Sequence, residues 1–230
     1  MEAIILAGGM GTRLRSVITN IPKPMAPIGG NPFLFYILKW LKKNKITRVI
    51  LAVGYKRESI KKEFGENFHS IDLVYSIEDT PLGTGGAIAL AMEKLKGDQF
   101  FILNGDTFFD IKLDDFLNFH QTDGFDFSIG LKPMKNFERY GSIKLDKNKK
   151  IVRFDEKLPK NKGLINGGVY FANQSIRKHF PTSEKFSFEI DFMEKMVTEL
   201  SFGGFINDNY FIDIGIPEDY ARAQIELLKL

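Results

Sequence analysis

Cysteine is absent from this 230-residue sequence, and tryptophan occurs only once. The lack of cysteine excludes disulfide frameworks, thiolate nucleophiles and cysteine-ligated zinc or iron–sulfur centres, and it suits a reducing compartment. The three histidines, His69, His120 and His179, lie far apart in the sequence. A metal ion is therefore expected to bind oxygen ligands, which favours Mg²⁺ or a similar hard divalent cation.

Long apolar runs and blocks of one charge are also missing. No apolar segment approaches the roughly 18 residues that a membrane helix needs, and the N-terminus lacks the cationic head of a signal peptide. We therefore expect a cytoplasmic protein with no membrane partner. The 32 lysines and arginines are scattered among 29 acidic residues, so no basic stripe predicts a nucleic-acid partner. The sequence leaves the oligomeric state open, with a homodimer among the alternatives.

The first half of the chain predicts strands that alternate with helices. Apolar and β-branched runs predict strands at 3–7, 49–53, 72–77 and 100–103, and helical spacing predicts helices at 33–43, 56–64 and 87–95. This alternation is typical of βαβ units and a parallel, Rossmann-like sheet. Sheets of this kind bind ligands at the carboxyl ends of their strands.

After residue 125 the predicted strands follow one another closely. They lie at 127–131, 141–145, 150–154 and 168–171, and two helices at 189–200 and 218–228 flank a last strand at 210–214. We therefore predict an α/β fold with a mixed, mainly parallel central sheet flanked by helices and a smaller antiparallel part. No linker or repeat divides the chain, so residues 1–230 are predicted to form a single domain with two halves, 1–110 and 111–230.

A glycine-rich loop directly follows the first predicted strand. Residues 6–13 have the sequence LAGGMGTR, whose glycines allow close backbone approach and can point N–H groups toward a phosphate chain. The dinucleotide fingerprint needs a further glycine where Leu14 stands, and the ATPase phosphate loop needs Gly-Lys-Ser/Thr, so neither motif matches. A purely structural tight turn is the alternative.

Pro22-Lys23-Pro24 follows about ten residues later. The two prolines stiffen the backbone from which the lysine projects. Alone this motif is usually a surface loop, but after the glycine loop it resembles the signature of the sugar-1-phosphate nucleotidyltransferases. The resemblance implies attack of a sugar 1-phosphate on the α-phosphorus of a nucleoside triphosphate, with Mg²⁺ as cofactor and release of pyrophosphate. It also implies that residues 1–110 mainly bind the nucleotide and residues 111–230 the sugar phosphate.

The same resemblance implies individual roles. The implied catalytic residues are Arg13, Lys23, Asp106 and Asp213, of which Asp106 and Asp213 would hold the metal. The implied nucleotide-binding residues are Leu6, Ala7, Gly8, Gly9, Gly11, Thr12, Arg13, Glu78, Gly83 and Asp106. The implied sugar-phosphate-binding residues are Tyr140, Gly141, Glu156, Lys157, Asn166 and Gly168. Taken singly, an aspartate in such a place is more often a turn residue or helix cap, and Glu156-Lys157 could be a solvated surface pair.

Glu78 bears on the choice of nucleotide. Guanine presents two adjacent N–H donors that one carboxylate can accept, whereas uracil presents one N–H between two carbonyl oxygens. Glu78 therefore favours GTP. Within the family, the short chain, the Glu78 segment and the Asn166 turn most resemble members that act on a heptose 1-phosphate for surface polysaccharide synthesis.

Several alternatives stay open at this point. They are guanylyl transfer to mannose 1-phosphate, uridylyl transfer to N-acetylmuramate 1-phosphate or a hexose 1-phosphate, and a non-catalytic subunit that binds nucleotide-sugars. A glycosyltransferase is a further alternative, although its metal site usually shows Asp-any-Asp, which Asp106-Thr107-Phe108 does not match.

Overall fold

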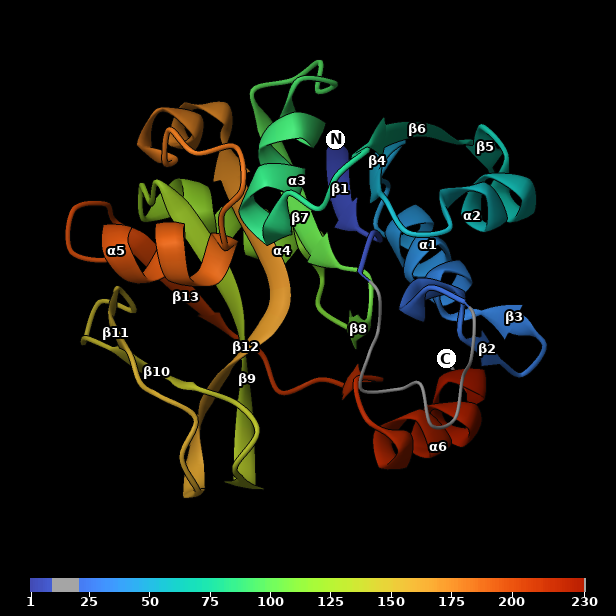
Figure 1. Ribbon diagram of the computed structural model, residues 1–230. Helices are drawn as coiled ribbons and strands as arrows, with labels where there is room; N and C mark the ends of the chain where they lie inside the picture. Colours follow the sequence, from blue (N-terminus) through green and yellow to red (C-terminus); the bar gives the residue numbers. More distant parts are fainter. Residues whose placement is uncertain (10–20, 230) are drawn as a thin grey trace.

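A ten-stranded sheet forms the centre of the protein (Figure 1). The computed structural model describes residues 1–9 and 21–229. The four central strands of the sheet are parallel and lie in the order β7–β1–β4–β6. Their bounds are β1 Glu2–Leu6, β4 Arg48–Val53, β6 Ile71–Ile77 and β7 Gln99–Asn104. The predicted parallel sheet of the first half is therefore confirmed.

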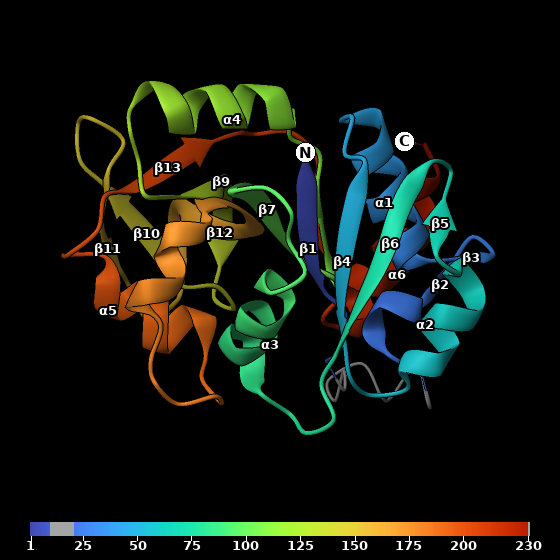
Figure 2. The same ribbon diagram turned by 90° about the horizontal axis from the view of Figure 1, so that it is seen from above.

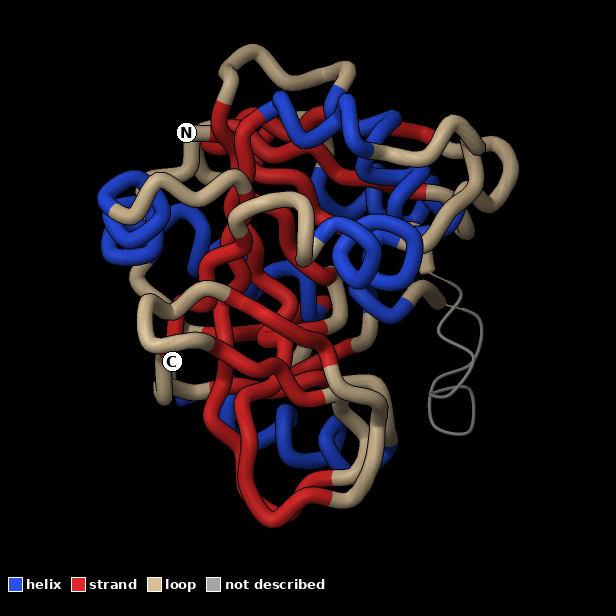
Figure 3. Tube along the Cα trace, turned by 90° about the vertical axis from the view of Figure 1, so that its left-hand side faces the viewer, coloured by secondary structure: helices blue, strands red, loops and turns tan. Residues whose placement is uncertain are grey.

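The second half continues the same sheet with mostly antiparallel strands. β12 (Lys160–Asn173) pairs with β9 (Phe127–Phe137) along most of its length. It also pairs with β7 through residues 169–173 and with β10 (Ser142–Leu145) through Leu164 and Ile165. The paired ends of β9 and β12 extend beyond the parallel strands (Figures 1 and 3). The remaining strands are β5 Asn67–Phe68, β11 Ile151–Phe154 and β13 Phe202–Ile206 in this sheet, and β2 Pro27–Ile28, β3 Asn31–Pro32, β8 Thr107–Phe109 and β14 Phe211–Asp213 in two small sheets.

Helices cover both faces of the sheet (Figure 2). Because strand side chains alternate between faces, Ala3 and Ile5 of β1 pack with α1 and α4, whereas Ile4 packs with α3 and the segment around Phe188. The helices are α1 Phe33–Lys43, α2 Arg57–Phe64, α3 Gly83–Met92, α4 Leu113–Thr122, α5 Glu194–Met196 and α6 Pro217–Glu226. Shorter turns of helix are η2 Lys23–Met25, η3 Gln174–His179, η4 Phe188–Met193 and η5 Leu227–Lys229.

Several elements differ from the sequence-based prediction. The predicted helix at 189–200 is divided into η4 and the short α5, and β9 covers residues 127–137 instead of 127–131. Helix α3 begins at Gly83 instead of residue 87, and β12 covers residues 160–173 instead of 168–171. Helix α4 and strand β13 were not predicted, and the glycine-rich sequence FGGFI of β13 explains why propensity gave no strand signal there. Among the residues that the structure describes, no helix combines the length and the apolar character needed to cross a membrane.

Candidate active site

The carboxyl ends of the parallel strands gather the predicted nucleotide-binding residues. Gly8 and Glu78 follow β1 and β6, and Asp106 lies two residues after β7. Gly54, which was not among the predicted residues, follows β4 at the same edge. Neighbouring strands pair in parallel and end at the same level, so the segments that follow them meet at one edge of the sheet. This is the edge at which open α/β sheets bind ligands.

Lys23 and Asp106 form a direct ion pair across this edge. Lys23 Nζ lies 2.8 Å from Asp106 Oδ2, and the lysine side chain is only 12% exposed. Gly105 makes the approach possible, because a Cβ there would lie 2.4 Å from Leu6 O and 3.1 Å from Pro24 Cγ. The Gly105 N–H also donates to Leu6 O at 3.0 Å. The proline-flanked lysine thus rests directly on the turn that carries the aspartate.

A small antiparallel ladder brings the second predicted aspartate to the same place. Strands β8 and β14 pair Thr107 with Asp213, and the Ile214 N–H donates to the backbone oxygen of Asp106 at 3.0 Å. Burial and the negative charge of Asp106 raise the pKa of Asp213. Asp106, far away in the sequence, is therefore close enough for its charge to oppose the ionisation of Asp213.

This pair of carboxylates suits a hard divalent cation. A cation between them would remove the repulsion that raises the pKa of Asp213, and both ligand atoms are oxygen. Within the described residues, no cluster of three or more acidic, histidine or cysteine side chains could hold a metal by itself. A site with two carboxylate ligands is typical of Mg²⁺ that is bound together with substrate phosphates.

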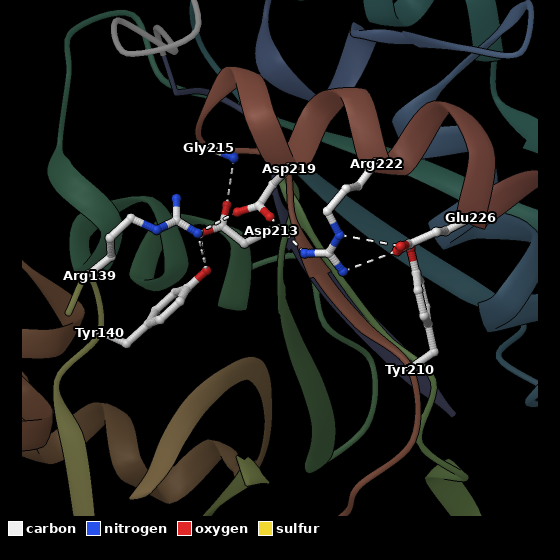
Figure 4. A network of polar contacts seen from close by, with 8 residues as sticks. All are labelled: Arg139, Tyr140, Tyr210, Asp213, Gly215, Asp219, Arg222 and Glu226. Carbon is white, nitrogen blue, oxygen red and sulfur yellow. Dashed lines mark hydrogen bonds and ion pairs between the residues drawn. The ribbon is translucent and has the colours of Figure 1, made fainter. Parts of the chain in front are cut away.

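A polar network reaches Asp213 from the second half of the chain (Figure 4). The Tyr140 hydroxyl donates to Asp213 Oδ2 at 3.3 Å, and the Gly215 N–H donates to Oδ1 at 2.8 Å. Arg139 donates to the Tyr140 hydroxyl at 3.0 Å and forms an ion pair with Asp219 of α6. Burial, followed by the charge of Asp213, raises the pKa of Tyr140, so this phenol stays a hydrogen-bond donor.

Helix α6 anchors the far end of this network. Asp219 also pairs with Arg222 at 2.9 Å, and Arg222 pairs with Glu226 at 3.1 Å. The Tyr210 hydroxyl donates to Glu226 at 3.0 Å. A cavity of about 1530 Å³, lined in part by Tyr140 and Asp213, opens beside the network. The predicted metal carboxylate is thus held rigidly at the wall of an accessible space.

The Glu78 side chain is fixed at the end of β6. Its Oε2 accepts the Leu82 N–H at 3.1 Å, while Oε1 lies so near the β1 and β4 ends that a Cβ at either Gly8 or Gly54 would be 2.6 Å away. A side chain at either position would therefore displace the Glu78 carboxylate. The carboxylate lies at the carboxyl edge of the parallel strands, and its role in base recognition stays a prediction.

Gly83 follows in a conformation that favours glycine, with φ of +74°, and a Cβ there would meet Phe186 O at 2.5 Å. The Gly85 N–H donates to the same oxygen at 3.0 Å. The start of α3 is thus held against the segment around Phe186, which explains why the helix can begin within a glycine-rich sequence.

On the predicted sugar side, Asn166 and Gly168 form one compact turn. Asn166 Oδ1 accepts the Gly168 N–H at 2.9 Å, and its Nδ2 donates to the hydroxyl of the buried Tyr170 at 3.0 Å. Gly168 has a φ of +71° and packs against the Asn104 side chain. This turn therefore lies beside the Asn104-Gly105-Asp106 turn.

Tyr140-Gly141 and Glu156-Lys157 are also brought together. A Cβ at Gly141 would lie 2.6 Å from the backbone oxygen of Asp155, whose side chain pairs with Lys160 at 2.6 Å. Glu156 and Lys157 follow directly and are exposed. Neither forms a hydrogen bond or ion pair with another described residue, so their implied contacts with sugar and phosphate remain predictions.

Three predicted nucleotide-binding residues, Gly11, Thr12 and Arg13, lie outside the described residues. Arg139 and Asp219, which position the Asp213 side of the site, were not predicted from the sequence. Nor was Glu189, which accepts a hydrogen bond from Thr84 in the predicted base-recognition segment. Arg139 directly precedes the predicted Tyr140-Gly141 segment, but nothing in the sequence pairs it with a residue 80 positions later.

The chain belongs to the nucleotidyl transferase family, whose model matches residues 2–229. Among curated proteins it is 52% identical to the D-glycero-alpha-D-manno-heptose 1-phosphate guanylyltransferase of Aneurinibacillus thermoaerophilus, over 99% of this chain and 98% of that protein. It is 49% identical to the enzyme of the same name from Campylobacter jejuni, over 96% and 97% of the two chains. The predicted family is therefore confirmed.

Solved structures agree with the fold. HddC from Yersinia pseudotuberculosis, in a crystal structure complexed with GMP-PN, superposes with a TM-score of 0.87 at 38% identity and covers 97% of each chain. A putative glucose-1-phosphate thymidylyltransferase from Bacillus anthracis gives the same TM-score at 20% identity, covering 100% of this chain and 96% of the other, which supports the fold alone.

Proposed function

We propose that this protein transfers a guanylyl group from GTP to D-glycero-α-D-manno-heptose 1-phosphate, with Mg²⁺, and forms GDP-heptose and pyrophosphate. The observation that carries the proposal is the 52% identity, over nearly the whole chain, to an enzyme with this name. The geometry supports the reaction class, because Lys23, Asp106 and Asp213 meet at the ligand-binding edge of the sheet. In this proposal the product supplies surface polysaccharide synthesis, and the enzyme acts in the cytoplasm.

The proposed reaction must bring two polyanions together. Two unit charges about 4 Å apart repel by roughly 4 kcal/mol at an effective dielectric constant of 20. The phosphate nucleophile is largely ionised at neutral pH, so the reaction needs alignment and charge neutralisation more than a general base. Lys23, whose ammonium group pairs with Asp106, is the proposed stabiliser of charge on the α-phosphate, and Arg13 and Lys157 are the proposed partners of the pyrophosphate and the sugar phosphate.

Asp106 and Asp213 are the residues that would hold Mg²⁺, which neutralises phosphate charge when bound. The Tyr140 hydroxyl and the Gly215 N–H hold the Asp213 carboxylate in one orientation before any substrate arrives. Lys23 already neutralises Asp106. In the proposed reaction the Lys23 ammonium group would leave Asp106 and pair with a phosphate oxygen of the nucleotide, and the Asp106 carboxylate would then be available to hold Mg²⁺.

The decisive experiment measures pyrophosphate release with Mg²⁺ for each of GTP, UTP, CTP, ATP and dTTP, paired with heptose 1-phosphate, mannose 1-phosphate and N-acetylmuramate 1-phosphate. The expected result is release with GTP and heptose 1-phosphate. Activity only with UTP would keep the reaction class but overturn guanine recognition by Glu78. Nucleotide-sugar binding without any pyrophosphate release would indicate a non-catalytic subunit.

The role of Glu78 in base choice has its own test. Glu78→Gln replaces one of two acceptor oxygens by an amide donor, which opposes the paired N–H groups of guanine. We expect kcat/KM for GTP to fall about tenfold or more, while kcat/KM for UTP does not fall. An unchanged preference for GTP over UTP would show that other groups read the base.

A further inference from the structure

Glu189 contacts the predicted base-recognition segment and directly follows Phe188, which packs against Tyr170 on the predicted sugar side, although no sequence motif marks it. Its Oε2 accepts the Thr84 hydroxyl at 2.7 Å and the Ser187 hydroxyl at 3.1 Å. Thr84 follows Gly83 in the base-recognition segment, and its hydroxyl in turn accepts the Phe188 N–H at 2.9 Å. The Glu189 carboxylate is thus held by two hydroxyl groups, and the residue is half-buried.

The residue before Glu189 packs against the predicted sugar side. The Phe188 ring meets the buried Tyr170 ring edge-on, with centroids 5.7 Å apart. Burial and then the charge of Glu189 raise the pKa of Tyr170. The Tyr170 hydroxyl accepts from Asn166 Nδ2 at 3.0 Å, and Asn166 is one of the predicted sugar-binding residues. Glu189 therefore lies in one neighbourhood with the Asn166 turn.

The negative charge of Glu189 determines which groups of a substrate it can bind. No lysine or arginine of residues 1–9 and 21–229 forms an ion pair with it, and its Oε1 has no hydrogen-bond donor among them. A fixed carboxylate repels phosphate but accepts strongly from hydroxyl groups, and hydrogen bonds to a charged acceptor are the stronger ones. An unneutralised, prealigned acceptor beside a site for a sugar phosphate is suited to the polyol part of that substrate.

We propose that Glu189 is a specificity-determining residue that accepts a hydrogen bond from a ring hydroxyl of the sugar 1-phosphate. Thr84 and Ser187 hold the carboxylate, and Oε1 receives the hydroxyl. The inference rests on the proposed function, because it assumes that a sugar 1-phosphate binds beside Asn166. It adds a contact between the sugar and the segment that also packs against the start of α3.

The test is steady-state kinetics of Glu189→Gln with GTP and the sugar 1-phosphate that the wild type accepts. We expect KM for the sugar phosphate to rise about tenfold, with kcat and KM for GTP nearly unchanged. Glu194→Gln is the matched control, since Glu194 is an exposed carboxylate on the following turn of the same segment. An unchanged KM for the sugar phosphate in a folded Glu189→Gln variant would overturn the proposal.

Deoxy substrates separate a direct contact from a structural effect. Removing the one hydroxyl that Glu189 accepts should raise KM for the wild type but add no further penalty in Glu189→Gln, whereas other deoxy positions should be additive. If 2′- or 3′-deoxy-GTP shows that coupling instead, Glu189 binds the ribose and the proposal is wrong. Glu189→Asp serves in the same cycle if the glutamine variant does not fold, because its shorter carboxylate should also lose the coupling.

The two proposals fail in different ways. If the wild type releases no pyrophosphate with any substrate pair, the proposed function fails and the sugar contact fails with it. If the wild type is active but every deoxy sugar is penalised equally in wild type and variant, only the role of Glu189 is overturned.

Discussion

Lys23 combines a proline-stiffened backbone with a nearly buried ammonium group next to a carboxylate. Replacing it by alanine removes the cation that we propose stabilises charge on the transferred phosphate. We expect Lys23→Ala to lower kcat by about 10² or more, the magnitude of a lost electrostatic stabiliser. The measurement is pyrophosphate release at saturating substrates. Lys45→Ala, which breaks an exposed ion pair with Asp114, should leave turnover unchanged; near-normal turnover of Lys23→Ala would remove Lys23 from the mechanism.

Gly54 offers a second test at the residue scale. A Cβ at Gly54 would lie 2.6 Å from Glu78 Oε1 and 2.8 Å from its Cγ, so Gly54→Ala must displace the Glu78 side chain. We expect KM for GTP to rise at least severalfold while KM for the sugar phosphate stays constant. Gly97→Ala is the control, because its Cβ would meet Glu2 Oε2 at an ordinary 3.5 Å. Equal GTP kinetics in both variants would refute the assignment of Glu78 to the base.

The sequence allowed the chemistry of single residues to be predicted better than their contacts. Lys23 and Asp106 follow from local motifs, and the structure places them 2.8 Å apart. Arg139 and Glu189 could not be found, because their partners Asp219 and Thr84 lie 80 and 105 positions away in the sequence. Only the packing of distant elements creates those contacts.

At the scale of elements, α6 and the end of β9 are joined through Asp219, which pairs with both Arg139 and Arg222. Removing this carboxylate leaves two guanidinium groups facing each other, whereas Arg139→Gln leaves Asp219 with one partner. We expect Asp219→Asn to lower the free energy of unfolding by about 1–3 kcal/mol, and more than Arg139→Gln. Urea denaturation measures both. A smaller loss for Asp219→Asn would show that the two arginines do not depend on it.

Element boundaries depended on contacts that local sequence does not encode. Residues 83–86 are mostly glycine and predict a loop, yet Phe186 O accepts the Gly85 N–H and packs against Gly83, so α3 starts there. β12 extends from 160 to 173 through Asn166-Gly167-Gly168, because β9 pairs with it on both sides of an irregular register. Tertiary pairing thus overrode weak propensity in both places.

At the scale of the whole molecule, the alternation of apolar runs was enough to predict a parallel sheet, since each βαβ unit carries its own periodicity. The joining of both halves into one sheet was not predicted. It depends on the antiparallel pairing of β12 with β7, which places Tyr170 opposite Ile102. That pairing sets the Asn166 turn beside the Asp106 turn and so determines where the two proposed substrates meet.

The same interior contains a histidine whose protonation links overall stability to pH. His120 is 2% exposed, its Nδ1 lies 2.8 Å from Ser128 Oγ, and burial lowers its pKa to about 4 despite the charge of Asp126. The unfolded chain binds this proton near pH 6.5 and the folded protein only near pH 4. Stability contributed by neutral His120 is therefore complete above pH 6.5 and declines as the pH falls to about 4, by at most about 3 kcal/mol.

We expect the free energy of unfolding of the wild type to decrease more between pH 6.5 and 4 than that of His120→Gln, which cannot bind the proton. Urea denaturation at half-unit pH intervals measures both curves, and their difference isolates His120 from the carboxylates that titrate in the same range. Parallel curves for wild type and His120→Gln would show that protonation of His120 does not lower the free energy of unfolding, which would contradict the prediction.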